Sequence, residues 1–425
     1  MRCGLNDFSY KDGVAHCEGL ALSDLATTYG TPLYVYSANT LRRHLRDFRQ
    51  ALEGLNALCA FAVKSNSNLT LLSMIKGEGF GADIVSGGEL QRCLKAGFSP
   101  DRIVFSGVGK RSDELELAVE KQIFSINVES LFELKTLVRV KVSEDAPVNV
   151  CLRLNFDIHA ATSDKIKTGA LDSKFGIPIA ELPEAMRLLK DAPKALRLRG
   201  LACHVGSQIL DLAPFSAACQ LLVQTASELR AQGLPIEFVD VGGGLGIRYK
   251  DENPPTLQDY ADVLRRCLLG QNLKLVTEPG RVLVGNAGIA ITKVLGVKRN
   301  PQKRFVVVDA GMNDLPRFAI YGAYHEILSV APRQGSQEVF DIVGPVCEST
   351  DALGKNRDMV EPMPGEYLFV RGAGAYCASM ASTYNTRPIA PEVLVDGNSV
   401  RLIRRRQTIE ELWAQETNEV QDNAK

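Results

Sequence analysis

A lysine at the end of an apolar segment is the first residue of this sequence that could do covalent chemistry. The segment LCAFAVK spans residues 58–64, reads as a buried strand and ends on Lys64, which SNSN follows. Alternation along a strand puts Lys64 on the same face as Ala62. A partly buried lysine has a lowered pKa and can attack an aldehyde to form a Schiff base. This chemistry suggests pyridoxal phosphate, although a lysine at a strand end can also be an ordinary solvated charge.

Three further features agree with such a cofactor, and each has a simpler alternative. The glycines of DVGGGLG (residues 240–246) follow a strand and could bring backbone N–H groups to a phosphate, or form only a tight turn. The spacing does not match a dinucleotide-binding loop, because the third glycine position is Ile247 or Tyr249. Glu278 could pair with a pyridine nitrogen or be a turn residue, and His204 could stack on a flat ring or be a core histidine.

These residues fall at the ends of strands in a repeating pattern. From residue 58, eight strand-like segments alternate with helical ones, which predicts a parallel eight-stranded β/α barrel. In such barrels the active site lies at the carboxyl ends of the strands. The expected ends carry Lys64, Asp83, Ser86, Ser106, Asn127, Arg153, His204, Ser207, the glycines at 242–244, Glu278 and Arg281. The long polar segment between the fifth and sixth strands, near residues 157–176, is expected to be a lid or binding loop.

The pattern changes after about residue 285 to strands with turn signals. We expect an α/β protein with a barrel over residues 36–285 and an all-β domain over 286–425, joined by part of residues 1–35. Thr408 and Glu411 form a capping-box pattern that predicts a short terminal helix.

Composition limits the partners and the location. The 425 residues are 45% hydrophobic, with 49 basic and 50 acidic side chains, so neither a nucleic-acid nor a membrane surface is indicated. Ten cysteines are present without zinc-site spacing, so we expect no metal site and free thiols in a reducing compartment. The start lacks a signal-peptide pattern, and a cytoplasmic enzyme is expected.

Several ordered motifs carry a family resemblance over nearly the whole chain. They are FAVKSNSN, DIVSGGEL, ACHVGSQ, DVGGGLGIRY, TEPGR, LPRFAIYGAYHEI, GPVCESTD and GAYCASMASTYNTRP. Together they resemble the group IV pyridoxal-phosphate decarboxylases of the alanine-racemase fold. The resemblance implies a carboxy-lyase that converts meso-2,6-diaminopimelate into L-lysine and CO2, the last step of lysine synthesis.

The resemblance also implies individual roles. Lys64 would hold pyridoxal 5′-phosphate covalently, His204 would stack on its ring and Glu278 would pair with the ring nitrogen. The phosphate would be held by Ser207, Gly243, Gly244, Gly280, Arg281 and Tyr376. Cys347 would donate the proton to Cα, and an ordinary thiol is mostly protonated at neutral pH. In this family the loop with the proton donor comes from the second subunit, which implies a homodimer with shared active sites.

The expected substrate has a second amino-acid head that the pocket must bind. Arg281, Arg317 and Tyr321 suit the distal carboxylate, because a guanidinium group binds a carboxylate through two hydrogen bonds, and Glu348 suits the distal ammonium. Tyr376 belongs to the same expected substrate set. Ornithine has no distal carboxylate, so burying Arg317 would be unfavourable in an ornithine decarboxylase.

Four departures from the family pattern bear on substrate breadth. Phe318 and Thr350 stand where proline and glycine are common, Val282 replaces a small polar residue, and Ser163–Asp164 replaces a His-Pro pair within residues 160–168.

Three other functions remain alternatives. They are decarboxylation of another basic amino acid or of carboxynorspermidine, racemisation, and non-catalytic binding of pyridoxal phosphate. Glu278 disfavours a racemase, because racemases of this fold tend to place an arginine at the pyridine nitrogen.

Overall fold

The computed structural model describes residues 7–140, 142–158, 173–192 and 194–417. The chain divides into two compact units. The barrel unit contains Thr40–Asn286 and Gly374–Ser379, and the β unit contains Met1–Asn39, Ala287–Ala373 and Met380–Lys425. The predicted lid residues 160–168, with Ser163 and Asp164, lie outside the described residues.

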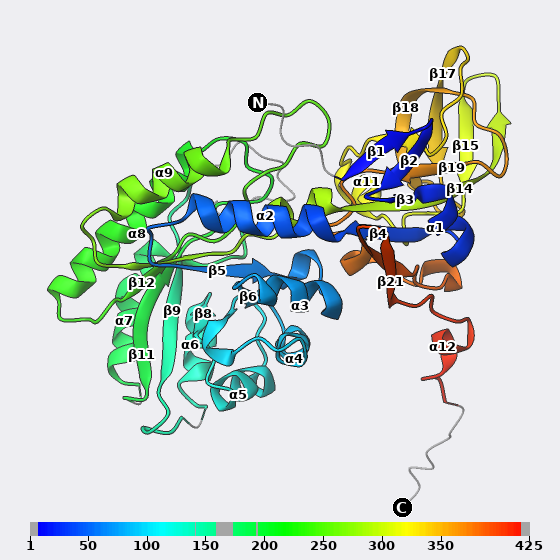
Figure 1. Cartoon of the computed structure of the whole chain (residues 1–425). Helices are drawn as coiled ribbons and strands as arrows, with labels where there is room; N and C mark the ends of the chain where they lie inside the picture. The colour runs from blue at the N-terminus through cyan, green and yellow to red at the C-terminus, as the bar shows by residue number, and fades with distance from the viewer. Residues whose placement is uncertain (1–6, 141, 159–172, 193, 418–425) are drawn as a thin grey trace, which may run out of the picture. The chain divides into compact units, whose positions relative to one another are not determined.

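The barrel unit is a closed parallel β/α barrel, which confirms the predicted fold class (Figure 1). Its strands are β5 (Ala57–Ala62), β6 (Gly81–Ile84), β7 (Ile103–Phe105), β8 (Ser125–Val128), β9 (Val148–Asn155), β11 (Leu196–Ala202), β12 (Phe238–Asp240) and β13 (Lys274–Thr277). They pair in this order, and β13 closes the barrel on β5. The short β10 (Ile177–Pro178) pairs with β9.

Helices precede, connect and follow the strands of the barrel. They are α2 (Ala38–Ala51), α3 (Leu69–Gly77), α4 (Gly87–Lys95), α5 (Ser112–Glu120), α6 (Leu131–Leu137), α7 (Leu182–Lys190), α8 (Ala213–Ala231), α9 (Leu257–Leu268) and α10 (Arg281–Val284). Local signals set their ends. Ser86 caps α4 by accepting from the Glu89 N–H at 3.2 Å, and Gly97 has a positive φ just after the helix.

The barrel interior is filled by apolar side chains from alternate strand positions. The core cluster contains Leu58, Ala60, Val104, Cys151, Ala202, Phe238 and Val276. Polar side chains replace apolar ones where the strands end. The barrel is therefore a packed core whose carboxyl-terminal rim carries the chemistry.

The β unit contains two sheets and short helices. Its elements are β1 (Phe8–Lys11), β2 (Val14–Cys17), β3 (Leu20–Ala21), α1 (Leu22–Tyr29), β4 (Leu33–Ser37), β14 (Gly288–Arg299), β15 (Arg304–Val308), α11 (Arg317–Tyr321), β16 (Ile327–Ser329), β17 (Gln337–Val343), β18 (Ala352–Val360), β19 (Tyr367–Val370), β20 (Glu392–Asp396), β21 (Ser399–Arg404) and α12 (Glu410–Trp413). The larger sheet has the order β18-β17-β15-β14-β4-β20-β21, with β19 pairing β14 and β16.

The predicted capping box at the last helix is present. The Glu411 N–H donates to Thr408 Oγ1 at 3.3 Å, and the Thr408 N–H donates back to Glu411 Oε2 at 2.9 Å. In the described part of the chain, no helix is both long and apolar enough to cross a membrane.

Candidate active site

Lys64 lies just past the end of β5, in a short 3₁₀ turn over Val63–Ser65. The prediction that a strand continues through Lys64 is therefore wrong, because the chain turns after Ala62, whose N–H donates to Pro279 O at 3.0 Å. The Lys64 amine donates to Asp83 Oδ2 at 2.8 Å. This contact brings the predicted nucleophile to the end of the neighbouring strand β6.

The charge environment of Lys64 differs from the expectation. Burial lowers the pKa of the Lys64 amine, but the carboxylates of Asp83 and Glu278 raise it, and the net pKa is raised. The predicted lowering is wrong because two acidic groups outweigh desolvation. The Lys64 side chain is 34% exposed while that of Asp83 is fully buried, so water screens the amine more than its partner.

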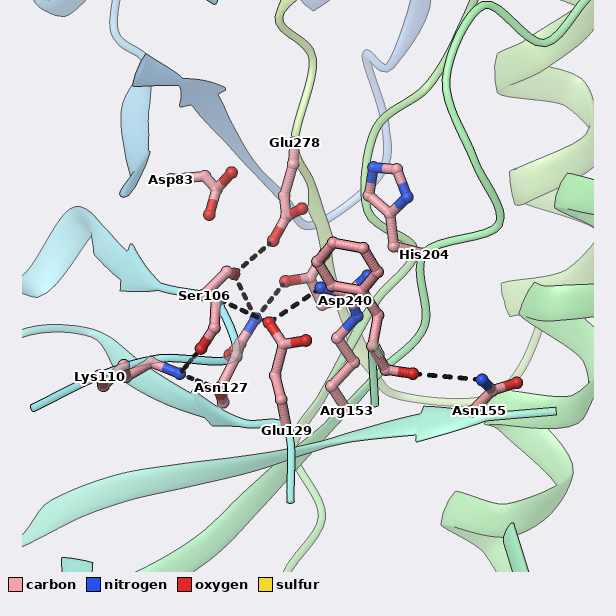
Figure 2. Close-up of polar contacts among 12 residues, drawn as sticks. Asp83, Ser106, Lys110, Asn127, Glu129, Arg153, Asn155, His204, Asp240 and Glu278 are labelled. Atoms are coloured by element: carbon pink, nitrogen blue, oxygen red, sulfur yellow. Dashed lines mark hydrogen bonds and ion pairs between the residues drawn. The ribbon is translucent and has the colours of Figure 1, made fainter. Parts of the chain in front are cut away.

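Three buried carboxyl groups face this end of the barrel. Asp83, Asp240 and Glu278 are at most 5% exposed, and Figure 2 shows the Asp240 carboxyl close to that of Glu278. Burial, and then the charges of Asp240 and Asp83, raise the pKa of Glu278 well above its usual range. Burial also raises the pKa of Asp240. The cluster therefore retains a proton that separate carboxylates would lose.

Hydrogen bonds favour Glu278 as the holder of that proton. Asp240 accepts N–H donors on both oxygens, from the Gly242 backbone at 2.9 Å and from Asn127 Nδ2 at 3.1 Å. Such bonds stabilise the ionised form of Asp240. Ser106 lies 3.1 Å from Glu278 Oε1 and contacts it through its hydroxyl (Figure 2). Glu278 is thus the carboxyl group best placed to share a proton with a basic ring nitrogen.

His204 is held as a neutral imidazole. Its Nδ1 accepts from the Gly206 N–H at 3.2 Å, so this nitrogen has no proton of its own. Burial, with the positive charges of Arg153 and Lys64, lowers the pKa of His204 well below its usual range. A neutral imidazole presents a flat face without adding charge, as stacking on an aromatic cofactor requires.

A second polar network lies beside the carboxyl cluster (Figure 2). Arg153 Nη1 donates to Glu129 Oε1 at 2.9 Å, and its guanidinium carbon lies 5.0 Å from the centre of the Phe175 ring. Lys110 pairs with Glu133 at 2.8 Å with both side chains almost fully buried. These pairs tie the ends of β7, β8 and β9 together.

The other group of predicted cofactor residues gathers around Arg281. Arg281 donates to Ser207 Oγ at 2.9 Å and to Tyr249 Oη at 2.8 Å, and its guanidinium carbon lies 4.8 Å from the Tyr376 ring centre. Tyr376 has a φ of 57° and donates its N–H to Ser65 O at 2.9 Å, in the turn that carries Lys64. Gly374–Ser379 thus form part of the barrel unit.

The glycine loop has little space for any side chain. A Cβ on Gly243 would lie 2.0 Å from Glu278 O, and one on Gly244 would lie 2.1 Å from Gly206 O. Gly244 also has a φ of +107°. Glycine is therefore required here by the neighbouring backbone, whether or not a phosphate approaches. Gly280 precedes α10 and packs against Ala62 and Ser65.

These residues fit pyridoxal phosphate in their chemistry. The partners of Arg281 in the described part of the chain are hydroxyls and an aromatic ring, and its buried Nε has no partner there. Such a cation suits a phosphate, which the hydroxyl of Ser207 can also bind. Lys64, Glu278 and His204 supply an amine, a carboxyl group and a flat face. Asp83 Oδ1 is also buried and has no hydrogen-bond partner among the described residues.

The four remaining predicted residues belong to the β unit. Arg317 begins α11 and is 6% exposed, while Tyr321 ends this helix half-buried. Cys347 and Glu348 are exposed. The Cys347 N–H donates to Asn385 Oδ1 at 2.7 Å, and Asp351 accepts from the Val346 N–H at 2.6 Å, which anchors the loop.

The three departures that lie within the described residues cause no visible strain. Phe318 lies within α11, and Val282 lies within α10. Thr350 is exposed and has no positive φ, so its position does not need glycine.

Sequence reasoning missed Asp240 as a site residue. The signal was present, because an aspartate inside the apolar strand FVDV is expensive to bury without a partner. Ser106 and Asn127 were placed at strand ends, but their hydrogen-bond roles depend on neighbours from other strands.

Comparisons with known proteins agree with this geometry. Residues 38–285 match the family model described as pyridoxal-dependent decarboxylase, pyridoxal binding domain. The chain is 44% identical to diaminopimelate decarboxylase of Zymomonas mobilis, with 96% of this chain and 98% of that protein covered. The protein of the same name from Vibrio cholerae is 45% identical, with 96% and 98% covered.

Solved structures give the same result. The structure of Helicobacter pylori diaminopimelate decarboxylase complexed with L-lysine has a TM-score of 0.88 at 40% identity and covers 92% of this chain and 98% of that one. The corresponding enzyme from M. jannaschii, also with L-lysine, has a TM-score of 0.89 at 34% identity and covers 97% and 98%. The chain belongs to the diaminopimelate decarboxylase family of pyridoxal-dependent decarboxylases.

Proposed function

We propose that this chain decarboxylates meso-2,6-diaminopimelate to L-lysine and CO2, with pyridoxal 5′-phosphate as its cofactor. The observation that supports this most strongly is the meeting of the Lys64 amine with the buried carboxyl groups of Asp83 and Glu278 at one end of the barrel. When bound, pyridoxal phosphate supplies an electron sink for the electron pair that CO2 leaves behind.

Residues of the barrel unit would hold the cofactor. Lys64 attaches it covalently, and Asp83 orients the Lys64 amine through their 2.8 Å contact. Glu278 would share its proton with the ring nitrogen, and neutral His204 would lie against the ring. The phosphate would be held by Ser207, Gly243, Gly244, Gly280, Arg281 and Tyr376.

The substrate's distal head would be bound by charged groups of matching sign. Arg317 and Tyr321, with Arg281 and Tyr376, bind the distal carboxylate, and Glu348 binds the distal ammonium. Burial supports the role of Arg317, because a 6% exposed guanidinium gains most from a carboxylate partner. A substrate without that carboxylate, such as ornithine, would leave the charge of Arg317 less compensated.

We propose that Cys347 donates the proton that replaces CO2 on Cα. Its exposure suits a group that acts on an active site of another subunit. The active enzyme would then be a homodimer in which each site uses the partner subunit's Cys347. A cytoplasmic location is supported by the nine free cysteines among the described residues.

Release of CO2 by the purified holoenzyme tests this function. The substrates to compare are meso-diaminopimelate, ornithine, arginine and carboxynorspermidine, with Lys64→Ala as the inactive control. We expect release from diaminopimelate alone. Release from ornithine or carboxynorspermidine instead would overturn the assignment of the distal pocket. Binding of the cofactor with no release from any substrate would indicate a non-catalytic binding protein.

A further inference from the structure

His325 and Arg317 form a buried contact in the β unit that has no assigned role. Arg317 Nη1 lies 2.8 Å from His325 Nε2, and His325 Nδ1 lies 2.8 Å from Arg371 O. Both side chains are nearly buried, with Arg317 6% and His325 3% exposed. We propose that His325 is a positioning residue that orients Arg317 toward the distal carboxylate of the substrate. This inference rests on the proposed role of Arg317.

The donor and acceptor chemistry fixes the state of the imidazole. A guanidinium group only donates hydrogen bonds, so His325 Nε2 must accept from Arg317. A backbone carbonyl only accepts, so His325 Nδ1 must carry the proton that it donates to Arg371. His325 is therefore neutral, with its single ring proton on Nδ1.

The local fold holds His325 at this point. α11 ends at Tyr321 and is capped by Gly322, which has a left-handed φ of 65°. The chain then turns back so that residue 325 reaches Arg317, which begins the helix. After His325 the chain enters β16, where Ile327 pairs with Val370 of β19. The Arg371 N–H donates to Glu326 O at 2.9 Å, which continues this ladder by one pair. The carbonyl that receives the His325 proton is thus fixed by the sheet.

A neutral acceptor has an advantage over a carboxylate at this position. A carboxylate would orient Arg317 but would also neutralise it and compete with the substrate's own carboxylate. The imidazole accepts one guanidinium N–H and leaves the positive charge in place. His325 thereby orients Arg317 without placing a competing negative charge beside it.

Two amide variants distinguish the roles of the two ring nitrogens. In His325→Gln the side-chain oxygen can stand at the place of Nε2 and accept from Arg317. In His325→Asn the amide nitrogen can stand at the place of Nδ1 and donate to Arg371, but the contact with Arg317 Nη1 is lost. The pair therefore distinguishes orientation of Arg317 from anchoring of the loop.

Two probes distinguish binding of the distal head from general damage. L-lysine is what remains after one carboxylate has left, so it keeps the distal carboxylate, whereas cadaverine lacks it. With holoenzyme, the dissociation constant of each ligand can be measured from the change in absorbance of the bound cofactor. We expect His325→Asn to weaken L-lysine binding about tenfold or more and cadaverine binding little, because Arg317 loses the hydrogen bond that orients it toward the carboxylate. His325→Gln should stay close to wild type for both.

The results distinguish a failure of the His325 proposal from a failure of the proposed function. Equal loss of L-lysine and cadaverine binding in His325→Asn, unchanged L-lysine binding, or equal loss of L-lysine in both variants would each overturn the role of Nε2. A wild-type holoenzyme that neither decarboxylates diaminopimelate nor binds L-lysine would instead overturn the proposed function.

The imidazole state can be tested without ligand. The chain has five histidines, few enough for assignment of ¹⁵N signals. We expect a protonated Nδ1 and an unprotonated Nε2 for His325, and the reverse assignment would contradict the proposal.

Discussion

Ser106 donates its hydroxyl proton to the carboxyl group of Glu278, and the donor direction is fixed by Asn127. Asp240 accepts from the Asn127 amide nitrogen at 3.1 Å, and the same nitrogen lies 3.2 Å from Ser106 Oγ. Ser125 donates to the amide oxygen of Asn127 at 3.2 Å, which keeps the amide in this orientation. Ser106 therefore accepts from Asn127 and directs its own proton to Glu278 at 3.1 Å.

Replacing Ser106 by alanine should weaken catalysis without removing the cofactor. Loss of the donated hydrogen bond raises the pKa of Glu278 further, so the proton stays on Glu278 and less of it reaches the ring nitrogen. We expect kcat to fall about tenfold or more, since a hydrogen bond to a charged group contributes about 1.5–3 kcal/mol. Cofactor affinity should change little.

The matched control for this variant is Ser73→Ala. Ser73 is exposed, and its hydroxyl contacts backbone carbonyls of the same unit, at Leu69 and Ala96. Steady-state kinetics should show wild-type turnover for Ser73→Ala. Equal turnover of the two variants would contradict the role of Ser106.

The buried Lys110–Glu133 pair should matter for stability far more than an exposed pair of similar length. The Lys110 amine donates to Glu133 at 2.8 Å and to the carbonyls of Gly107 and Asn127 at 2.7 Å each. Lys110→Met leaves the Glu133 carboxylate buried without its cation. We expect the free energy of unfolding to fall by about 3–5 kcal/mol in urea denaturation.

Lys121→Met is the control for this comparison. Lys121 also contacts an acid, Glu120, at 2.7 Å, but these side chains are 38% and 67% exposed. Its loss should cost about 1 kcal/mol or less. Similar losses in Lys110→Met and Lys121→Met would show that burial does not decide the strength of these pairs.

Asp314 should make the protein less stable as the pH rises from about 4 to about 6. Burial, partly offset by the hydrogen bond from the Gly311 N–H, raises the pKa of Asp314 to about 6. An unfolded aspartate titrates near 3.9, so in this window the native state binds the extra proton and loses stability as the proton leaves. At pH 7 the free energy of unfolding is lower by roughly 2–3 kcal/mol than it would be with Asp314 protonated in both states.

Asp314→Asn should remove this part of the pH dependence. The asparagine oxygen can still accept from the Gly311 N–H, which lies 3.0 Å from the aspartate oxygen. The free energy of unfolding should therefore fall less between pH 4.5 and pH 6.5 than in wild type. Glu89, whose pKa burial also raises to about 6, is unchanged in both proteins and does not affect the difference. If the free energy of unfolding changed equally with pH in the two proteins, the raised pKa of Asp314 would be refuted.

The barrel was predictable because its strands are short apolar segments separated by helices with clear caps. β14 (Gly288–Arg299) has a similarly clear signal, because its first residues are mostly apolar and Gly288–Thr292 are all buried. β18 has a weaker sequence signal, because it is an edge strand with the exposed polar residues Lys355 and Asn356 at its centre.

The charges of the site could not be predicted in the same way. Lys64 was recognised from its place after a strand, but its pKa depends on Asp83 and Glu278, which reach it from other strands. The contact of Arg317 with His325 likewise depends on the left-handed turn at Gly322 and on the β16–β19 ladder. Position along the chain identified the chemical groups, whereas their protonation states required the fold.

The last prediction tests whether active sites are shared between subunits. Lys64→Ala removes the proposed attachment of the cofactor, and Cys347→Ala removes the proposed proton donor. Each variant alone should lose most of its activity, and loss of a general acid typically costs about 10²–10⁴-fold.

If the sites are shared, a mixed dimer contains one site with both residues intact, because its Lys64 and Cys347 come from different subunits. Random exchange of two equal populations makes half of the dimers mixed, so about a quarter of wild-type activity should return. The measurement is CO2 release after the two purified variants have been mixed under conditions that allow subunit exchange, with each variant mixed with itself as the control. Sites built within one subunit would give no recovery, because every site in the mixture would lack one of the two residues. That outcome would overturn the shared-site proposal while leaving the roles of Lys64 and Cys347 intact.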